Sequence, residues 1–135
     1  MKKLILVLLI LVSASSAYAQ GGDPSPSQTS APPTSRFEII QSPLAAKWTF
    51  RLDKYTGSVK QLVKTKDDGT AWESMMVIAL PKVPLDPKVR YQIFTSGLAA
   101  RHTFLLNVET GQSWVLTTFK DDKSGDVSGW SPFEN

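Results

Sequence analysis

The segment Arg36-Phe-Glu-Ile-Ile-Gln-Ser-Pro-Leu-Ala-Ala-Lys-Trp-Thr-Phe50 returns later in the chain as Arg90-Tyr-Gln-Ile-Phe-Thr-Ser-Gly-Leu-Ala-Ala-Arg-His-Thr-Phe104. The second segment is displaced by 54 positions, and the match continues without a gap to position 122, with 15 identities among 33 aligned positions. Chance does not produce agreement of this length without gaps, so it indicates two tandem copies of one structural unit. The second copy then has four extra residues, because Trp72 and Trp130 are 58 positions apart, and we expect this insertion in a loop.

Each copy is predicted to consist of β-strands. Apolar side chains recur at every second position, which is the period of a half-buried strand and not of a helix. The alternating residues expected to form the apolar face are Phe37, Ile39, Trp48, Phe50 and Leu52 in the first copy, and Tyr91, Ile93, Phe104, Leu106 and Trp114 in the second. Third strands are expected over residues 59–65 and 113–119, and fourth strands over residues 72–80 and 130–133.

The sequences Asp53-Lys-Tyr-Thr-Gly57 and Asn107-Val-Glu-Thr-Gly111 separate the second and third predicted strands. An Asp or Asn side chain can open a turn by accepting a backbone hydrogen bond, and a glycine can end it with a positive φ. Both segments are therefore predicted to be hairpin turns that close on a bulge.

The connector between the copies, residues 81–89, contains Pro81, Pro84 and Pro87 and cannot continue a central strand. A small sheet with one apolar face is not stable alone, so the two copies are expected to cover each other. The predicted fold is all-β, with two three-to-four-stranded antiparallel repeats, residues 36–80 and 90–135, in a pseudo-twofold sandwich or small barrel.

The N-terminus has the three parts of a secretory signal peptide. Met1-Lys2-Lys3 is basic, residues 4–12 are an uninterrupted apolar run, and Ala17-Tyr18-Ala19 has small residues at the cleavage positions. A membrane anchor is the alternative, but this run of nine residues would reach only about half of a hydrocarbon core of roughly 30 Å. We expect cleavage after Ala19, a flexible Pro/Ser-rich linker over residues 20–35, and a single β domain over residues 36–135. The product is expected to be soluble, in the bacterial periplasm or outside the cell.

Composition excludes several classes of function. The chain is 41% hydrophobic and 20% charged, which is typical of a globular domain. Without Lys2 and Lys3, thirteen basic residues face twelve acidic ones, a balance too even to favour nucleic acid as a partner. The chain has no Cys and one His, which excludes Cys/His nucleophilic sites and the usual zinc sites, and no cofactor or metal is predicted.

Most of the remaining candidate residues are expected to have structural roles. His102, which alternates with Phe104 and Leu106, is predicted to be a core or edge residue and not a catalytic base. The pairs Asp67-Asp68 and Asp121-Asp122 suggest a calcium site, but neighbouring lysines neutralise part of their charge. We therefore expect these pairs to lie in solvated turns.

Four tryptophans form the last candidate group. Trp72 and Trp130 occupy corresponding places in the two copies, which favours a role in packing. Trp48 and Trp114 each occur in one copy only, and a position that varies while the repeat persists is where a binding role could have been added. Trp48 and Trp114 are therefore the candidate ligand-binding residues, and no catalytic residue is predicted.

The hairpin Asn107-Val-Glu-Thr-Gly111-Gln-Ser-Trp114 resembles the strand-turn-strand unit that ends the blades of quinoprotein-type β-propellers. It is also similar to hairpins of uncharacterised secreted bacterial β-repeat proteins. The resemblance covers about a dozen residues per copy and implies a turn with a packed edge, not a quinone site. The first copy departs from the pattern, with Lys60 in place of Trp114, and two copies are too few for a propeller of four or more blades.

The function that we expect is that of an exported, non-enzymatic binding or interaction module. Its partner would be an unidentified protein or small ligand, held on a face or in a cleft between the two repeats. Two alternatives stay open: a small periplasmic hydrolase or inhibitor of an enzyme, and a structural subunit of a cell-envelope assembly.

The signal peptide leads to a prediction about processing. The mature chain should begin at Gln20, because Ala17 and Ala19 occupy the small-residue positions that signal peptidase requires. Intact-mass measurement of the exported protein checks this start. A mass that still includes residues 1–19 would identify the apolar run as an anchor.

Overall fold

The computed structural model describes residues 31–45, 47–84, 86–96, 99, 102–122 and 125–133, and these residues form strands and no helix. None of them therefore belongs to a helix long and apolar enough to cross a membrane.

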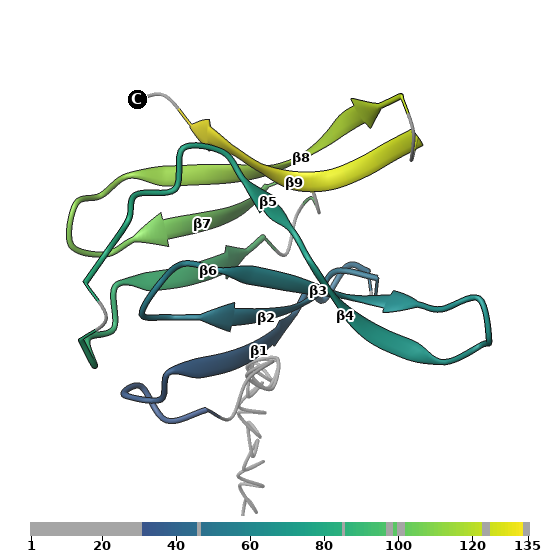
Figure 1. The fold of residues 1–135 in the computed structure, drawn as a ribbon. Helices are drawn as coiled ribbons and strands as arrows, with labels where there is room; N and C mark the ends of the chain where they lie inside the picture. Colours follow the sequence, from purple (N-terminus) through teal and green to yellow (C-terminus); the bar gives the residue numbers. More distant parts are fainter. Residues whose placement is uncertain are drawn as a thin grey trace, which may run out of the picture.

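The strands lie in two separate sheets and do not close into a barrel (Figure 1). The antiparallel first sheet has the order β1 (Phe37–Gln41), β2 (Thr49–Asp53), β3 (Val59–Lys64), β4 (Thr70–Ser74). The second has the order β5 (Met76–Val77), β9 (Gly125–Phe133), β8 (Ser113–Asp121), β7 (Thr103–Asn107), β6 (Tyr91–Thr95), and only β5 runs parallel to its neighbour β9.

The first three strands of each half pair in the same register. Phe37 lies opposite Asp53 in the first sheet, and Tyr91 lies opposite Asn107 in the second, so each partner is displaced by 54 positions. The pairs between the second and third strands keep this displacement. Every residue of β1, β2 and the first part of β3 therefore has a counterpart at the same place in β6, β7 and β8.

The turn between β2 and β3 is the hairpin turn that was predicted. The Asp53 side chain accepts a hydrogen bond from the Tyr55 amide (3.0 Å), and the Gly57 amide donates to the Asp53 carbonyl (2.8 Å). Asn107 makes the same bonds in the turn that ends at Gly111. Both glycines have φ of +77°, which confirms the expected positive φ.

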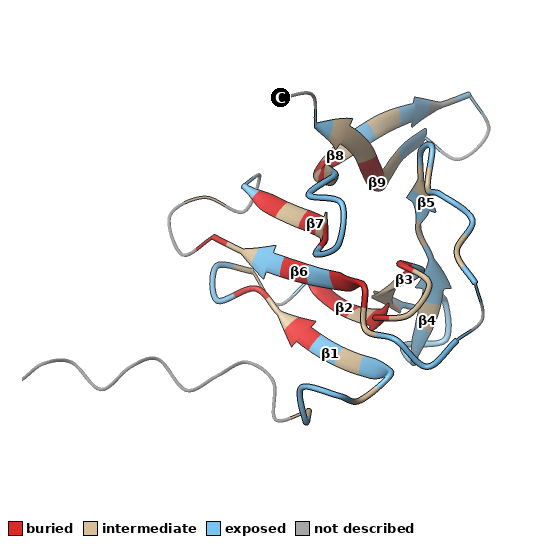
Figure 2. Cartoon of the chain, turned by 90° about the vertical axis from the view of Figure 1, so that its left-hand side faces the viewer, coloured by how far each residue is buried: buried red, intermediate tan, exposed pale blue. Residues whose placement is uncertain are grey.

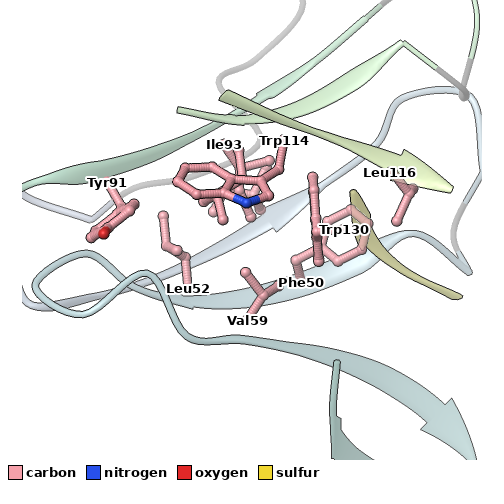
Figure 3. Packing of buried hydrophobic residues seen from close by; sticks show 10 residues of the cluster. Phe50, Leu52, Val59, Tyr91, Ile93, Trp114, Leu116 and Trp130 are labelled. Carbon is pink, nitrogen blue, oxygen red and sulfur yellow. The ribbon is translucent and has the colours of Figure 1, made fainter. Parts of the chain in front are cut away.

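A single hydrophobic core lies between the two sheets (Figure 3). Its closest aromatic contact joins the sheets, because the rings of Phe50 and Trp130 meet edge to face with centroids 5.5 Å apart. Side chains of both halves thus form the core, so each half covers the apolar face of the other. The buried core residues are Ile40, Phe50, Leu52, Val59, Tyr91, Ile93, Leu105, Trp114, Leu116 and Trp130.

The two sheets contact each other through faces that do not correspond. The strand register places Ile40, Phe50 and Leu52 on one face of the first sheet, and this face is buried. The counterparts of these residues in the second sheet lie on its outer face, and the opposite face is buried there. A twofold axis brings the same face of both units into contact. The buried faces of the two sheets do not correspond in this way, so the structure does not confirm the predicted pseudo-twofold relation.

The predicted apolar face is also wrong for part of each sheet. Phe37 and Ile39 point outward and are each 51% exposed, whereas the adjacent Ile40 is buried. In β7, Leu105 is buried and Leu106 is only half-buried. Adjacent apolar residues point to opposite faces of a strand, so packing between the sheets decides which one is buried. Burial alternates along β1, β6 and β7 (Figure 2).

The predicted fourth strand over residues 72–80 is interrupted at Met75. Here the chain leaves the first sheet, and β5 joins the edge of the second sheet beside β9. The Met75 amide still donates to the Val59 carbonyl, whereas the Ile78 amide donates to the Trp130 carbonyl (both 3.0 Å). The first half thus provides a short fifth strand to the sheet of the second half.

The hairpin that contains the four extra residues has longer strands in the second copy. β8 and β9 have nine residues each, compared with six in β3 and five in β4. The predicted strand at residues 130–133 is accordingly only the end of a strand that begins at Gly125.

The two turn glycines lead to a prediction with a built-in comparison. A Cβ at Gly57 would lie 2.8 Å from the Tyr91 ring, whereas a Cβ at Gly111 would have no heavy atom within 4 Å. Gly111→Val should lower the free energy of unfolding by about 1 kcal/mol or more, because valine is strained at a positive φ. Gly57→Val should lower it further, because its side chain would also clash with the Tyr91 ring. Urea denaturation of both variants measures the two losses. Equal losses would show that the Gly57 turn does not pack on the second half.

Neither half is expected to fold alone. Burial of a large apolar side chain contributes about 1.5–3 kcal/mol, whereas ordering the backbone costs about 1–2 kcal/mol per residue. Each half would expose the core face that the other covers. Residues 36–86 and 87–135, produced separately, should lack amide dispersion and strand circular dichroism. Two independently folded halves would contradict a shared core.

Candidate functional site

A cleft of about 840 Å³ lies between the two sheets, beyond the end of the core. The β3–β4 and β8–β9 hairpins extend past the core on the same side of the molecule (Figure 1). The cleft is formed by β3, β4 and the crossover to β5 on one side, and by the β8–β9 hairpin on the other. Its lining residues are Gln61, Glu73, Ser74, Met75, Met76, Phe119, Lys120, Asp122, Asp126, Val127 and Ser128.

The cleft opens where the inward-facing side chains change from apolar to polar. Along the inner face of β8, buried Trp114 and Leu116 are followed by exposed Thr118 and Lys120. Along the inner face of β3, buried Val59 is followed by Gln61, which is half-exposed. Polar groups without partners are costly to bury, so the two sheets do not close over these positions. The strands that form the core therefore also form the cleft.

The cleft combines acidic groups with an apolar surface. Glu73 belongs to the first sheet, whereas Asp122 and Asp126 belong to the β8–β9 hairpin, and all three side chains are exposed. Lys120 is the one basic residue among the lining residues described, and it lies directly opposite Asp126 in the β8–β9 register. The part of the lining that the structure describes is therefore net acidic, which favours a cationic ligand.

The apolar part of the cleft lies at the crossover between the sheets. Met75, Met76, Phe119 and Val127 line it, and Met76 is 50% exposed. Methionine is unbranched and polarisable, so a surface with Met adapts to the shape of different apolar groups. The cleft can thus contact an apolar side chain and a positive charge of the same ligand.

The two predicted ligand-binding tryptophans do not line this cleft. Trp114 is fully buried, and its Nε1 donates to the Ile78 carbonyl at 2.7 Å. Trp114 therefore presents no surface on which a ligand could stack in this structure. Trp48 is half-buried; its ring stacks on Phe50 with centroids 6.2 Å apart, and the Lys47 ammonium lies 4.8 Å from its centroid.

The other tryptophans and the histidine lie outside the cleft. Trp130 is fully buried, as expected for packing, and Trp72 is half-buried with the Arg51 guanidinium 5.5 Å from its ring centroid. His102 is exposed in the loop just before β7, so it does not lie in the core.

The first acidic pair lies in a solvated turn, as predicted. Asp67 and Asp68 are exposed in the β3–β4 turn, where Asp68 forms a 2.6 Å ion pair with Lys64. In the second pair, Asp122 lines the cleft, and the side chain of Asp121 lies outside the part of the structure that is described. Among the described residues, no three His, Cys, Asp or Glu side chains form a group that could hold a metal ion.

A smaller cavity of about 210 Å³ lies beside Arg36, Tyr55 and Asp86. Its charged groups are already engaged in ion pairs. Arg36 contacts Asp53 at 2.8 Å, and Arg90 contacts Asp86 at 2.5 Å. The hydrogen bond from Arg90 holds the pKa of Asp86 below its usual value. These groups stabilise the local structure around the turns, and the large cleft is the stronger candidate for a site.

Reasoning from the sequence missed Glu73 and the two methionines of the cleft, and it considered Asp122 only as part of a possible calcium site. Two signals point to them in retrospect. The insertion lengthens the β8–β9 hairpin, and the polar residues Gln61, Thr118 and Lys120 interrupt the inward apolar series. Neither signal shows that the two hairpins face each other, because that depends on how the sheets stack.

Comparison with known proteins assigns the chain to no family. The family models, the curated proteins and the solved structures give no significant match. The resemblance to propeller-type hairpins remains a prediction, and the function is inferred from the cleft.

Proposed function

We propose that this chain is an exported binding module, and that its cleft holds a cationic, partly apolar peptide segment of another protein. The cleft between the two sheets carries this proposal, because it places three carboxylates beside an exposed methionine and aromatic surface. A volume of about 840 Å³ is within the range of sites that hold a small ligand or a few residues of peptide.

The backbone of β4 supports a peptide as the ligand. β4 is an edge strand, since it pairs with β3 on one side only, and Glu73 and Ser74 of this strand line the cleft. An edge strand presents backbone amides and carbonyls with which an extended peptide can pair. Carboxylates and methionines would then select side chains, with Lys or Arg next to an apolar residue as the preferred pattern.

The cleft depends on the two halves being tandem repeats, residues 36–80 and 90–135, stacked head to tail. The common displacement of 54 residues in strand register supports the repeat, and the burial of non-corresponding faces supports the stacking. In this stack the far ends of the β3–β4 and β8–β9 hairpins stay apart, because the inward-facing residues at these ends are polar. The binding site would thus require both copies of the repeat, because each copy provides one side of the cleft.

The same carboxylates favour a second candidate, a small hydrolase. Glu73 and Asp126 reach the cleft from opposite sheets, and two carboxyl groups can act as general acid and base. Both side chains are exposed, whereas a carboxyl that acts as a general acid is normally removed from water. We therefore favour binding over catalysis.

Binding can be tested with the two cleft methionines as reporters. The chain has three methionines, and Met1 lies in the predicted signal peptide, so a methyl-labelled mature protein reports on Met75 and Met76 alone. An alternating Lys-Leu pentapeptide should shift both methyl signals, and an alternating Glu-Leu pentapeptide should not. The double variant Glu73→Gln/Asp126→Asn should weaken binding of the Lys-Leu peptide by up to about thirtyfold, because each of the two exposed charge pairs contributes about 0–1 kcal/mol.

The matched control is Asp67→Asn, which removes an exposed carboxylate from the β3–β4 turn outside the cleft. This variant should bind the Lys-Leu peptide like the wild type. Equal shifts with both peptides, or an affinity unchanged in the double variant, would reject the acidic cleft as the binding site. Cleavage of the peptide during the titration would favour the hydrolase.

A further inference from the structure

The outer face of the second sheet repeats the buried face of the first. Ile40, Phe50 and Leu52 form the buried face of the first sheet, and their counterparts 54 positions later are Phe94, Phe104 and Leu106. Phe94 is 60% exposed, and Phe104 and Leu106 are half-exposed. Phe133, which is 51% exposed and packs edge to face on Phe104 with ring centroids 5.5 Å apart, extends this surface.

The outer face of the first sheet likewise repeats the buried face of the second. Tyr91 and Ile93 are buried between the sheets, and their counterparts Phe37 and Ile39 are each 51% exposed. The molecule therefore carries, on its two opposite outer faces, counterparts of both sides of its own internal interface.

Backbone contacts of the internal interface have counterparts at the outer faces too. The Lys54 carbonyl accepts hydrogen bonds from the amides of Arg90 (2.8 Å) and Tyr91 (2.9 Å), which connects the first sheet to the second. At the outer faces, the corresponding groups are the carbonyl of exposed Val108 and the amides of Arg36 and Phe37.

The glycine turns follow the same pattern. The Gly57 turn packs on the Tyr91 ring across the internal interface. At the corresponding Gly111 turn, a Cβ would meet no heavy atom within 4 Å, and the counterpart of Tyr91 is exposed Phe37. A second copy that places its Phe37 against the Gly111 turn would repeat the internal contact.

We propose that copies of this chain associate head to tail, with the outer face of the second sheet of one copy on the outer face of the first sheet of the next. The occupant of each face is a second copy, because the internal interface already shows how the corresponding surfaces pack. Such a contact uses a different surface on each partner, so it closes into a ring or continues as an open stack. This self-association goes beyond the proposed peptide binding and does not depend on it.

Two positions carry different residues on the outer face of the first sheet and on the buried face of the second. Both differences should make the interface between copies weaker than the internal interface. Arg51 and Lys60 stand on the outer face of the first sheet where Leu105 and Trp114 stand in the core. Cations can pack over aromatic rings, and the opposite face presents Phe94 and other aromatic side chains. We therefore expect reversible association that depends on protein concentration and not a permanent oligomer.

Sedimentation velocity of the mature protein tests the proposal through two one-face variants. Ile39→Asp blocks the outer face of the first sheet, and Phe94→Asp blocks that of the second. The wild-type sedimentation coefficient should rise with concentration, and each variant alone should associate at least about tenfold more weakly, because a charge is buried at every contact. An equimolar mixture of the two should form a heterodimer and nothing larger, because only one pair of intact faces remains.

The control is Leu44→Asp, which makes the same chemical change at a 46% exposed apolar residue in the loop after β1. This variant should associate like the wild type. Formation of the heterodimer also shows that both blocked variants are folded. A wild type that stays monomeric at all concentrations overturns the proposal. Undiminished association of Ile39→Asp alone, without rescue of Phe94→Asp on mixing, indicates a symmetric dimer and also overturns it.

Discussion

The edge-to-face contact between Phe50 and Trp130, with ring centroids 5.5 Å apart, determines how the two sheets face each other. Side chains alternate between the two faces of a strand, so burying Phe50 also directs Ile40 and Leu52 inward and turns Ile39 outward. The second sheet is subject to the same rule and buries the opposite set of positions. This combination of buried faces accounts for the composition of the core, for the apolar residues that point outward and for the separation of the two hairpins.

The first three strands and the hairpin turn of each half were predictable from the sequence, and the choice of buried face was not. An Asx side chain that accepts a backbone hydrogen bond and a glycine four positions later determine each hairpin turn locally, and both glycines have the expected φ. Ile39-Ile40 and Leu105-Leu106 are adjacent apolar pairs, so either face of these strands could have been buried. Contacts between residues distant in sequence decide the choice. Trp114 is a predicted ligand-binding residue because it occurs in only one copy, whereas the structure buries it in the core.

Different parts of β8 and β9 contribute to the core and to the cleft. Leu116 and Trp130 close the core, and the next cross-strand pair on the same face, Thr118 and Ser128, begins the polar part of the hairpin. The strands that form the core thus also form the walls of the cleft. The crossover at Met75 and Met76 adds an adaptable apolar surface between these walls.

The two-residue strand β5 has a consequence for the order in which the chain folds. The other strands of each sheet pair with neighbours in sequence, and such hairpins form quickly because few residues separate their strands. Met76 and Val77, by contrast, pair with Gly129 and Trp130, which come after the entire second meander. The loop-closure entropy of this pairing is compensated only once β9 is in place on β8. We therefore expect β5 to be the last strand to pair in the second sheet, because it needs β9 in place on β8.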